Sequence, residues 1–66
     1  MNKTEQKQIS IARQYATIWP IYAARILSVL RRSTRNNVTI ATTAAVINEF
    51  KLEDYFVPGT NYMLTR

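Results

Sequence analysis

The sequence predicts an all-α fold, in which a long bent helix and a shorter second helix form a hairpin and the C-terminal tail docks on them. The first observation is a run of apolar residues spaced three or four apart from residue 9 to residue 30, the seam of an amphipathic helix. The second is a similar series between residues 40 and 50, and the third is a strong turn at Pro58-Gly59. The seam consists of Ile9, Ala12, Ala16, Trp19, Ala23, Ile26 and Leu30.

The length of the chain limits its stability. Its 66 residues make a single small helical domain, which buries only about 60% of the surface of the unfolded chain. A lone core of this size is marginal, and the usual remedies are disulfides, a structural metal or a partner chain. The absence of cysteine and histidine leaves the partner chain. With 47% hydrophobic residues to form an interface, we expect an intertwined or side-by-side homodimer and no cofactor.

The composition favours a cytoplasmic protein, because the absence of cysteine fits a reducing compartment. Lys3 and Lys7 precede an apolar run, but Arg13 interrupts this run and no cleavage site follows, so we expect no targeting segment. Only eleven residues separate Arg13 from Arg25, whereas roughly 20 are needed to span a bilayer. We therefore expect no transmembrane segment.

The net charge of +5 is unevenly distributed. Residues 1–48 hold seven basic residues and one acidic residue, while residues 49–66 are slightly acidic. This asymmetry favours an anionic partner such as nucleic acid or a membrane surface. It is equally consistent with one half of a dimer complementing the other.

The first helix is expected to begin near Asn2, which has the spacing of a capping box with Glu5, and to continue to Ser33. A second apolar stripe flanks the seam, so the apolar face is wider than that of a simple surface helix. We expect one side of this face to meet the second helix and the other side to meet a second copy. The second stripe consists of Ile11, Tyr15, Ile18, Tyr22 and Val29.

Pro20 lies in the middle of this helix, where a proline removes a hydrogen bond and clashes with the carbonyl four residues back, at a cost of about 3 kcal/mol. If the helix ended near Thr17 and restarted at Pro20, the apolar register would be free to change, but it does not change. The crowded carbonyl also belongs to the small Ala16. These points favour one helix bent between Ala16 and Pro20, and the alternative is two helices with a tight break.

The second helix is expected from Val38 to about Asp54, with Thr39 as its N-cap. Asn36 or Asn37 is expected to end the first helix in the left-handed conformation. The many β-branched residues of this segment also suit a strand. Its alanines and the helical spacing of its apolar residues favour a helix. These apolar residues are Ile40, Ala44, Ile47 and Phe50.

The C-terminal segment contains Pro58-Gly59, a dipeptide typical of a type II turn. Residues 61–66 follow this turn, and we expect them to fold back as an extended arm with Tyr62 and Leu64 docked on the helices. A winged helix would use Tyr55–Leu64 as its wing, but it needs a third helix, which exists only if Pro20 breaks the first one. A helix-turn-helix is weakly supported, because the chain lacks a glycine-containing turn between two short helices.

Four arginines are the candidate nucleic-acid or anion contacts. At roughly 100° per residue, Arg25, Arg32 and Arg35 project together opposite the seam, and Arg31 lies nearby. A row of arginines along a helix would follow phosphates or enter a major groove. A solvated polar face whose charges favour the helix dipole explains the same pattern, and both interpretations remain open.

We expect no enzymatic activity. Glu49 and Glu53 share a helical face with Asp54 adjacent, and paired carboxylates support acid–base chemistry or a divalent cation. No histidine or glycine-rich loop accompanies them, and no base is available to activate a serine or threonine. A solvated acidic helix end is the simpler explanation, so we assign no catalytic residue, no metal ligand and no small-molecule substrate.

The aromatic residues stand mostly at core spacing, which favours core or interface positions over base stacking. Trp19 is the expected interface anchor, because large aromatic side chains dominate such contacts. The residues expected at the dimer or partner interface are Tyr15, Trp19, Tyr22, Ile26 and Leu30.

These features predict a small regulatory or adaptor protein that acts by protein–protein interaction as a helical homodimer. The alternative is a nucleic-acid-binding regulator that uses the Arg25–Arg35 face. Binding to a membrane surface ranks third, because a second helix competes for the apolar face. A compact, basic chain without motifs is also typical of accessory proteins of phages and mobile elements.

Overall fold

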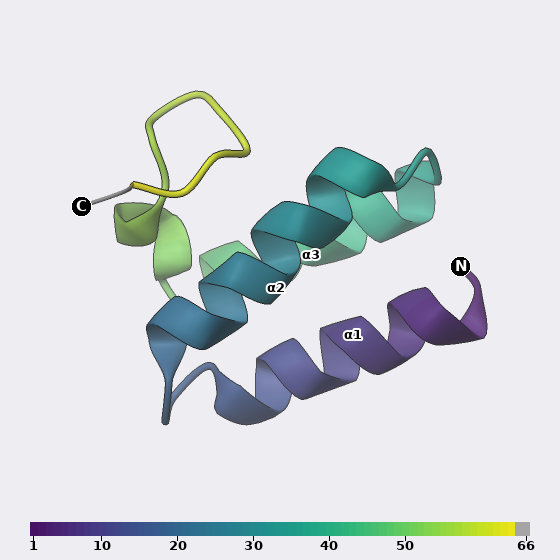
Figure 1. The fold of residues 1–66 in the computed structure, drawn as a ribbon, viewed down its shortest axis with the longest axis horizontal. Coiled ribbons are helices and arrows are strands. Elements are labelled where there is room, and N and C mark those ends of the chain that lie inside the picture. The colour runs from purple at the N-terminus through teal and green to yellow at the C-terminus, as the bar shows by residue number, and fades with distance from the viewer. Residues whose placement is uncertain (65–66) are drawn as a thin grey trace.

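A computed structural model describes residues 1–64, and its three α-helices confirm the all-α class (Figure 1). Within these residues the only extended pairing is a single antiparallel bridge between Phe56 and Met63. A short 3-10 helix, η1, precedes this bridge. The elements are α1 (Lys3–Tyr15), α2 (Pro20–Ser33), α3 (Asn37–Glu49) and η1 (Leu52–Tyr55).

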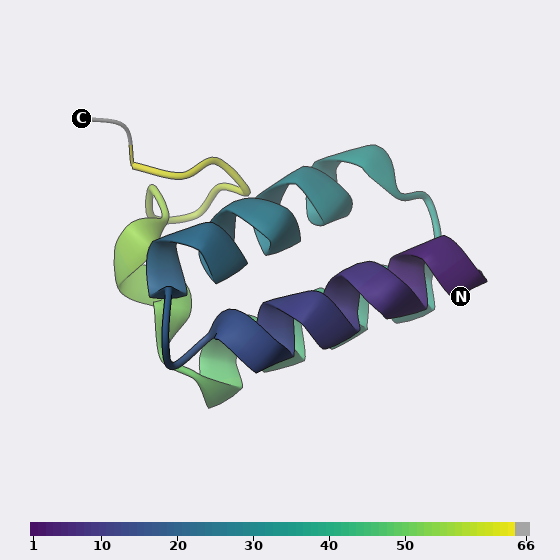
Figure 2. The same cartoon turned by 60° about the horizontal axis from the view of Figure 1, so that its bottom comes forward.

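The three helices lie alongside one another, and successive helices run in opposite directions (Figures 1 and 2). The N-terminus therefore lies near the loop that joins α2 to α3, while the C-terminal tail lies near the start of α2. Among residues 1–64, no helix combines the length and the apolar character needed to cross a bilayer.

The single bent helix predicted for the first half of the chain is wrong, because the helix breaks before Pro20. α1 ends at Tyr15, whose carbonyl accepts hydrogen bonds from the N–H groups of Ile18 at 3.1 Å and Trp19 at 2.7 Å. Trp19 leaves the helical region with φ −130° and ψ 74°, as the residue before a proline tends to do. Pro20 then takes the first position of α2, where its missing N–H costs nothing.

The seam keeps its phase across the break because each helix buries a face of its own. Ile9 and Ala12 of α1 are buried, as are Ala23 and Leu30 of α2. A continuous apolar period therefore did not require a continuous helix.

The break changes which residues of the seam are covered. Trp19, expected in the seam, is 59% exposed, and Ile26 is only half-buried. Leu27, which lies outside the seam, is fully buried. The helix that begins at Pro20 thus turns a different set of side chains inward than a helix continued from α1 would.

Capping explains where the helices begin. The predicted cap at Asn2 is confirmed, because its Oδ1 accepts a hydrogen bond from the Glu5 N–H at 2.8 Å. α3 is capped by Asn36 rather than Thr39, since the Asn36 Oδ1 accepts hydrogen bonds from the N–H groups of Val38 at 2.8 Å and Thr39 at 3.3 Å.

The predicted helix end at Ser33 is confirmed, but its predicted cap and the predicted end of the next helix need correction. α2 ends at Ser33 with the extended residue Thr34 as its C-cap, so no left-handed asparagine is involved. α3 ends at Glu49 rather than near Asp54, because Lys51 adopts a left-handed backbone with φ 57° and the chain then turns into η1.

Threonines occupy buried positions of α3. The Thr39 hydroxyl donates to the Glu5 carboxylate at 2.8 Å, and the Thr43 hydroxyl donates to the Ile40 carbonyl at 2.8 Å, so neither buried hydroxyl lacks a partner. The buried face of α3 is therefore rotated from the predicted one, and consists of Thr39, Thr43, Val46 and Ile47.

The predicted turn at Pro58-Gly59 is present. Gly59 has φ +78°, and the Thr60 N–H donates to the Val57 carbonyl at 3.0 Å, as in a type II turn. The chain then returns antiparallel to itself, because the Val57 N–H donates to the Tyr62 carbonyl at 2.9 Å.

The returning arm rests on α2 by way of its backbone. The Ser28 hydroxyl donates to the Asn61 carbonyl at 2.5 Å, and Met63 packs against the core. Tyr62 and Leu64, which were expected to dock on the helices, stay more than half exposed. Thr65 and Arg66, the end of the predicted arm, lie outside the described residues.

Two conditions for a winged helix are met, namely a third helix and a returning arm. The arrangement nevertheless differs from a helix-turn-helix, in which the two helices cross at roughly 90–120°. Here α2 and α3 run back along each other (Figures 1 and 2), and the arm lies against α2 rather than beside α3.

Candidate interaction surface

The break at Pro20 brings three aromatic rings together at the corner between α1 and α2. Tyr15 ends α1, Trp19 precedes α2, and Tyr22 lies in the first turn of α2. The rings of Tyr15 and Trp19 are stacked with centroids 5.4 Å apart, and Tyr22 meets both rings edge-on at 5.4 and 6.3 Å. Such offset and edge-to-face pairs hold the rings in fixed positions.

This corner is exposed although it is apolar. Tyr15 is half-buried, whereas Trp19 and Tyr22 are exposed. Ile18 and Ile21 flank the rings and are also more than half exposed. We call these five residues the aromatic corner: Tyr15, Ile18, Trp19, Ile21 and Tyr22.

The other two residues of the predicted interface lie elsewhere. Ile26 is half-buried on α2, and Leu30 is only 7% exposed and belongs to the core. The sequence interpretation also missed Ile21, which is in neither apolar stripe. A helix start at Pro20 would have indicated it, because Ile21 then falls in the first turn of α2, where it is exposed.

The four predicted anion contacts are only partly brought together. Arg25 and Arg32, seven residues apart on α2, line the same groove. Arg35 is exposed but follows the end of α2 at Ser33, so the helical period no longer determines its direction. Arg31 is half-buried, and its Nε has no hydrogen-bond partner within residues 1–64.

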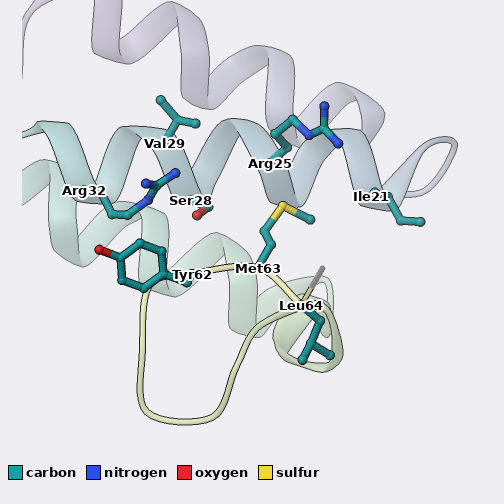
Figure 3. Close-up of a pocket in the computed structure, with 8 residues that line it drawn as sticks. All are labelled: Ile21, Arg25, Ser28, Val29, Arg32, Tyr62, Met63 and Leu64. Atoms are coloured by element: carbon teal, nitrogen blue, oxygen red, sulfur yellow. The ribbon is translucent and has the colours of Figure 1, made fainter. Parts of the chain in front are cut away.

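The groove that contains Arg25 and Arg32 lies between α2 and the C-terminal arm and has a volume of about 640 Å³ (Figure 3). α2 supplies one wall, and the arm supplies the other. The Arg32 guanidinium lies 5.0 Å from the centroid of the Tyr62 ring, a cation–π contact that orients it. The residues of the arm that line the groove are Tyr62, Met63 and Leu64.

A second groove, of about 350 Å³, lies on the other side of the exposed face of α2, against α1. Thr4 and Gln8 of α1 form its far wall. Arg25 and Val29 line both grooves, so these two side chains form a ridge between them. Neither groove was foreseen, because both depend on contacts between distant parts of the chain.

The acidic residues near the end of α3 have different surroundings. Glu49 pairs with Arg13 across α3 and α1, with Nη1 and Oε1 3.0 Å apart, while Glu53 and Asp54 are exposed in η1. Within residues 1–64, no three acidic side chains cluster in a way that would hold a metal ion.

The surroundings of Glu5 lower its pKa. Hydrogen bonds from the hydroxyls of Thr34 and Thr39 stabilise its charged form and lower its pKa below the ordinary value. Because these bonds join α1 to the C-cap of α2 and to the first turn of α3, we assign Glu5 a structural role.

In comparisons with known proteins, no protein-family model, no curated protein and no solved structure matches this chain. The candidate interaction surface consists of the aromatic corner and the two grooves beside α2.

Proposed function

We propose that this chain is a non-enzymatic regulatory or adaptor protein that acts by protein–protein interaction as a homodimer. One observation supports the proposal above all, namely the exposed apolar surface formed by three aromatic rings packed together and two isoleucines next to them in the sequence. Single exposed apolar residues are normal on a monomer, but a contiguous patch marks an interaction site.

The composition of the aromatic corner suits self-association. It contains no arginine, lysine or carboxylate, so two copies could meet there without repulsion between like charges. Tryptophan and tyrosine are the side chains that contribute most to protein interfaces. The small size of the domain gives a reason for pairing, because a core of this size supplies little stability alone.

Replacing Trp19 with serine tests the proposed dimer. Trp19 is the N-cap of α2 and makes no side-chain capping hydrogen bond, and serine is a favourable N-cap residue. Trp19→Ser should therefore remove the interface anchor while α2 remains folded. By sedimentation velocity, the wild-type chain should be a dimer at micromolar concentrations, and Trp19→Ser should weaken association at least about tenfold.

Val38 provides the matched control, because it is 61% exposed, apolar and located on α3 at the opposite end of the molecule. Val38→Ser should leave the dimer intact, and far-UV circular dichroism should show equal helicity in all three proteins. A wild-type chain that sediments as a monomer at high micromolar concentration would rule out the dimer.

Nucleic-acid binding is the second candidate function, favoured by the excess of positive charge in residues 1–48 and by the exposure of Arg25, Arg32 and Arg35. Titration of a mixed-sequence DNA duplex against salt tests it. For a protein that contacts phosphates, the logarithm of the affinity falls linearly with the logarithm of the salt concentration, with a slope of about 0.9 per contact. Replacing the three arginines with glutamine should then abolish binding, whereas absent binding at low salt would exclude this candidate.

A further inference from the structure

The solvent-facing side of α2 alternates apolar and cationic side chains. Ile21, Arg25, Val29 and Arg32 are all exposed, and they follow one another along one side of the helix (Figure 3). Within residues 1–64, no salt bridge involves either arginine of this series. This face is therefore both apolar and positively charged.

The shape of the surface allows an elongated partner to lie along α2. The ridge of Arg25 and Val29 separates the two grooves, and Ile26 lines the groove between α2 and α1. A helix placed beside the ridge would insert apolar side chains into a groove and keep its backbone hydrogen bonds internal. Recognition of an amphipathic helix in a groove works in this way.

We propose that the exposed face of α2 binds an acidic amphipathic helix of another protein. Arg25 and Arg32 are seven residues apart, which corresponds to about 10.5 Å along the helix axis. This distance sets the spacing of the carboxylates that the ligand must present. The bound helix would present carboxylates seven positions apart, one to Arg25 and one to Arg32, with aliphatic side chains between them opposite Val29. This inference rests on the proposed function in protein–protein interaction and specifies the class of partner.

Arg32 is prepared for such a contact. Its guanidinium already lies over the Tyr62 ring, so part of its conformational freedom is lost before a ligand binds. The planar guanidinium can still form paired hydrogen bonds with a carboxylate while it stacks on the ring.

A second copy of this chain is a poor occupant of the face. Two α2 helices paired antiparallel about the point between residues 28 and 29 would place Arg25 of one copy opposite Arg32 of the other. Residues 1–64 also present no matching acidic face. Glu5 is bound by two threonines, Glu49 is paired with Arg13, and the remaining two carboxylates are adjacent in η1.

Nucleic acid is also a poor occupant. Protein surfaces that bind DNA are more polar and more positively charged than those that bind proteins. Here Val29 separates the two arginines, and Ile21 and Leu64 extend the apolar surface beside them.

The test uses a fluorescein-labelled synthetic peptide of about 20 residues, long enough to form a helix on its own. It carries glutamates seven positions apart on a face of leucine and alanine. A control peptide replaces both glutamates with glutamine. Fluorescence anisotropy should show saturable binding of the acidic peptide to the wild-type chain, and affinity for the control peptide at least about tenfold weaker.

Variants of the chain locate the site. Arg25→Gln combined with Arg32→Gln should weaken binding of the acidic peptide at least about tenfold. Arg35→Gln removes an exposed arginine beyond the end of α2 and should leave binding unchanged. Val29→Ser should weaken binding of both peptides, because the apolar contact is common to them.

Three outcomes would overturn the proposal: no binding of the acidic peptide, equal binding of the two peptides, or binding that the double arginine variant retains. Displacement of the peptide by a DNA duplex, with the steep salt dependence of phosphate contacts, would assign the face to nucleic acid instead. The Trp19→Ser sedimentation experiment changes a residue that lines neither groove, so the homodimer can stand even if the peptide experiments fail.

Discussion

The Glu5 carboxylate at the start of α1 accepts a hydrogen bond from the Thr39 hydroxyl of α3 at 2.8 Å. Its other oxygen accepts a hydrogen bond from the Thr34 hydroxyl at 2.6 Å, just beyond the end of α2. One side chain thus joins α1 to the junction of α2 and α3, at the opposite end of the molecule from the aromatic corner.

This contact predicts a specific dependence of stability on pH. The Thr34 and Thr39 hydroxyls lower the pKa of Glu5, so the carboxylate stabilises the fold at neutral pH. That contribution should be lost as the pH falls below about 4.3, the ordinary pKa of glutamate, and through the lower folded value. Glu5→Gln should therefore have a lower Tm than the wild-type chain at neutral pH and a flatter profile in acid.

Thermal unfolding followed by circular dichroism between neutral pH and about pH 2 measures this effect. Glu53→Gln is the control, since Glu53 is exposed in η1 and should leave the profile unchanged. If Glu5→Gln retained the full acid sensitivity of the wild-type chain, the bonds to the two threonines would not be its source.

The second prediction concerns Pro20 at the first position of α2. There the ring restricts the unfolded chain without removing a hydrogen bond from the helix, so Pro20→Ala should destabilise the fold by about 0.4–1 kcal/mol. Urea unfolding measures this change. A stabilised variant with increased helicity would instead indicate that alanine lets α1 and α2 join into one helix.

The third prediction compares two neighbours on α2. Leu27 is fully buried, so Leu27→Ala should cost about 2–5 kcal/mol, enough to unfold a large fraction of so small a domain. Ile26 is half-buried beside a groove, and Ile26→Ala should cost clearly less. Equal losses in urea unfolding would contradict this packing of α2.

The all-α class, the Asn2 cap and the Pro58-Gly59 turn were predictable because each depends on local chemistry. The break of the helix before Pro20 was not predictable, because a proline inside a bent helix and a proline at a helix start allow the same spacing of apolar residues. The seam could not separate these cases because α1 and α2 each bury their own face. Once the break is known, the position of Leu27 in the core follows.

The candidate site was predictable in parts. Trp19 and Tyr22 were identified as interface residues from their size and spacing, and both are exposed. Arg25 and Arg32 were placed on one face by the helical period, and they line one groove. The groove itself depends on the arm returning to α2, a contact between residues more than 30 positions apart that no local pattern encodes.

The last prediction concerns Arg13 of α1, which makes two contacts at the end of α3. Its Nη1 and Nη2 donate to the two carboxylate oxygens of Glu49 at 3.0 and 3.3 Å, and its guanidinium lies 5.6 Å from the centre of the Phe50 ring. The paired side chains are 48% and 50% exposed, so the ion pair should contribute no more than about 1 kcal/mol. Glu49→Ala removes the ion pair alone, whereas Arg13→Ala also removes the cation–π contact, worth about 0.5–1 kcal/mol. The arginine variant should therefore be the less stable of the two.

A double-mutant cycle in urea isolates the coupling between Arg13 and Glu49, which should shrink as salt is added. Equal losses from the two single substitutions would mean that Phe50 contributes nothing through Arg13.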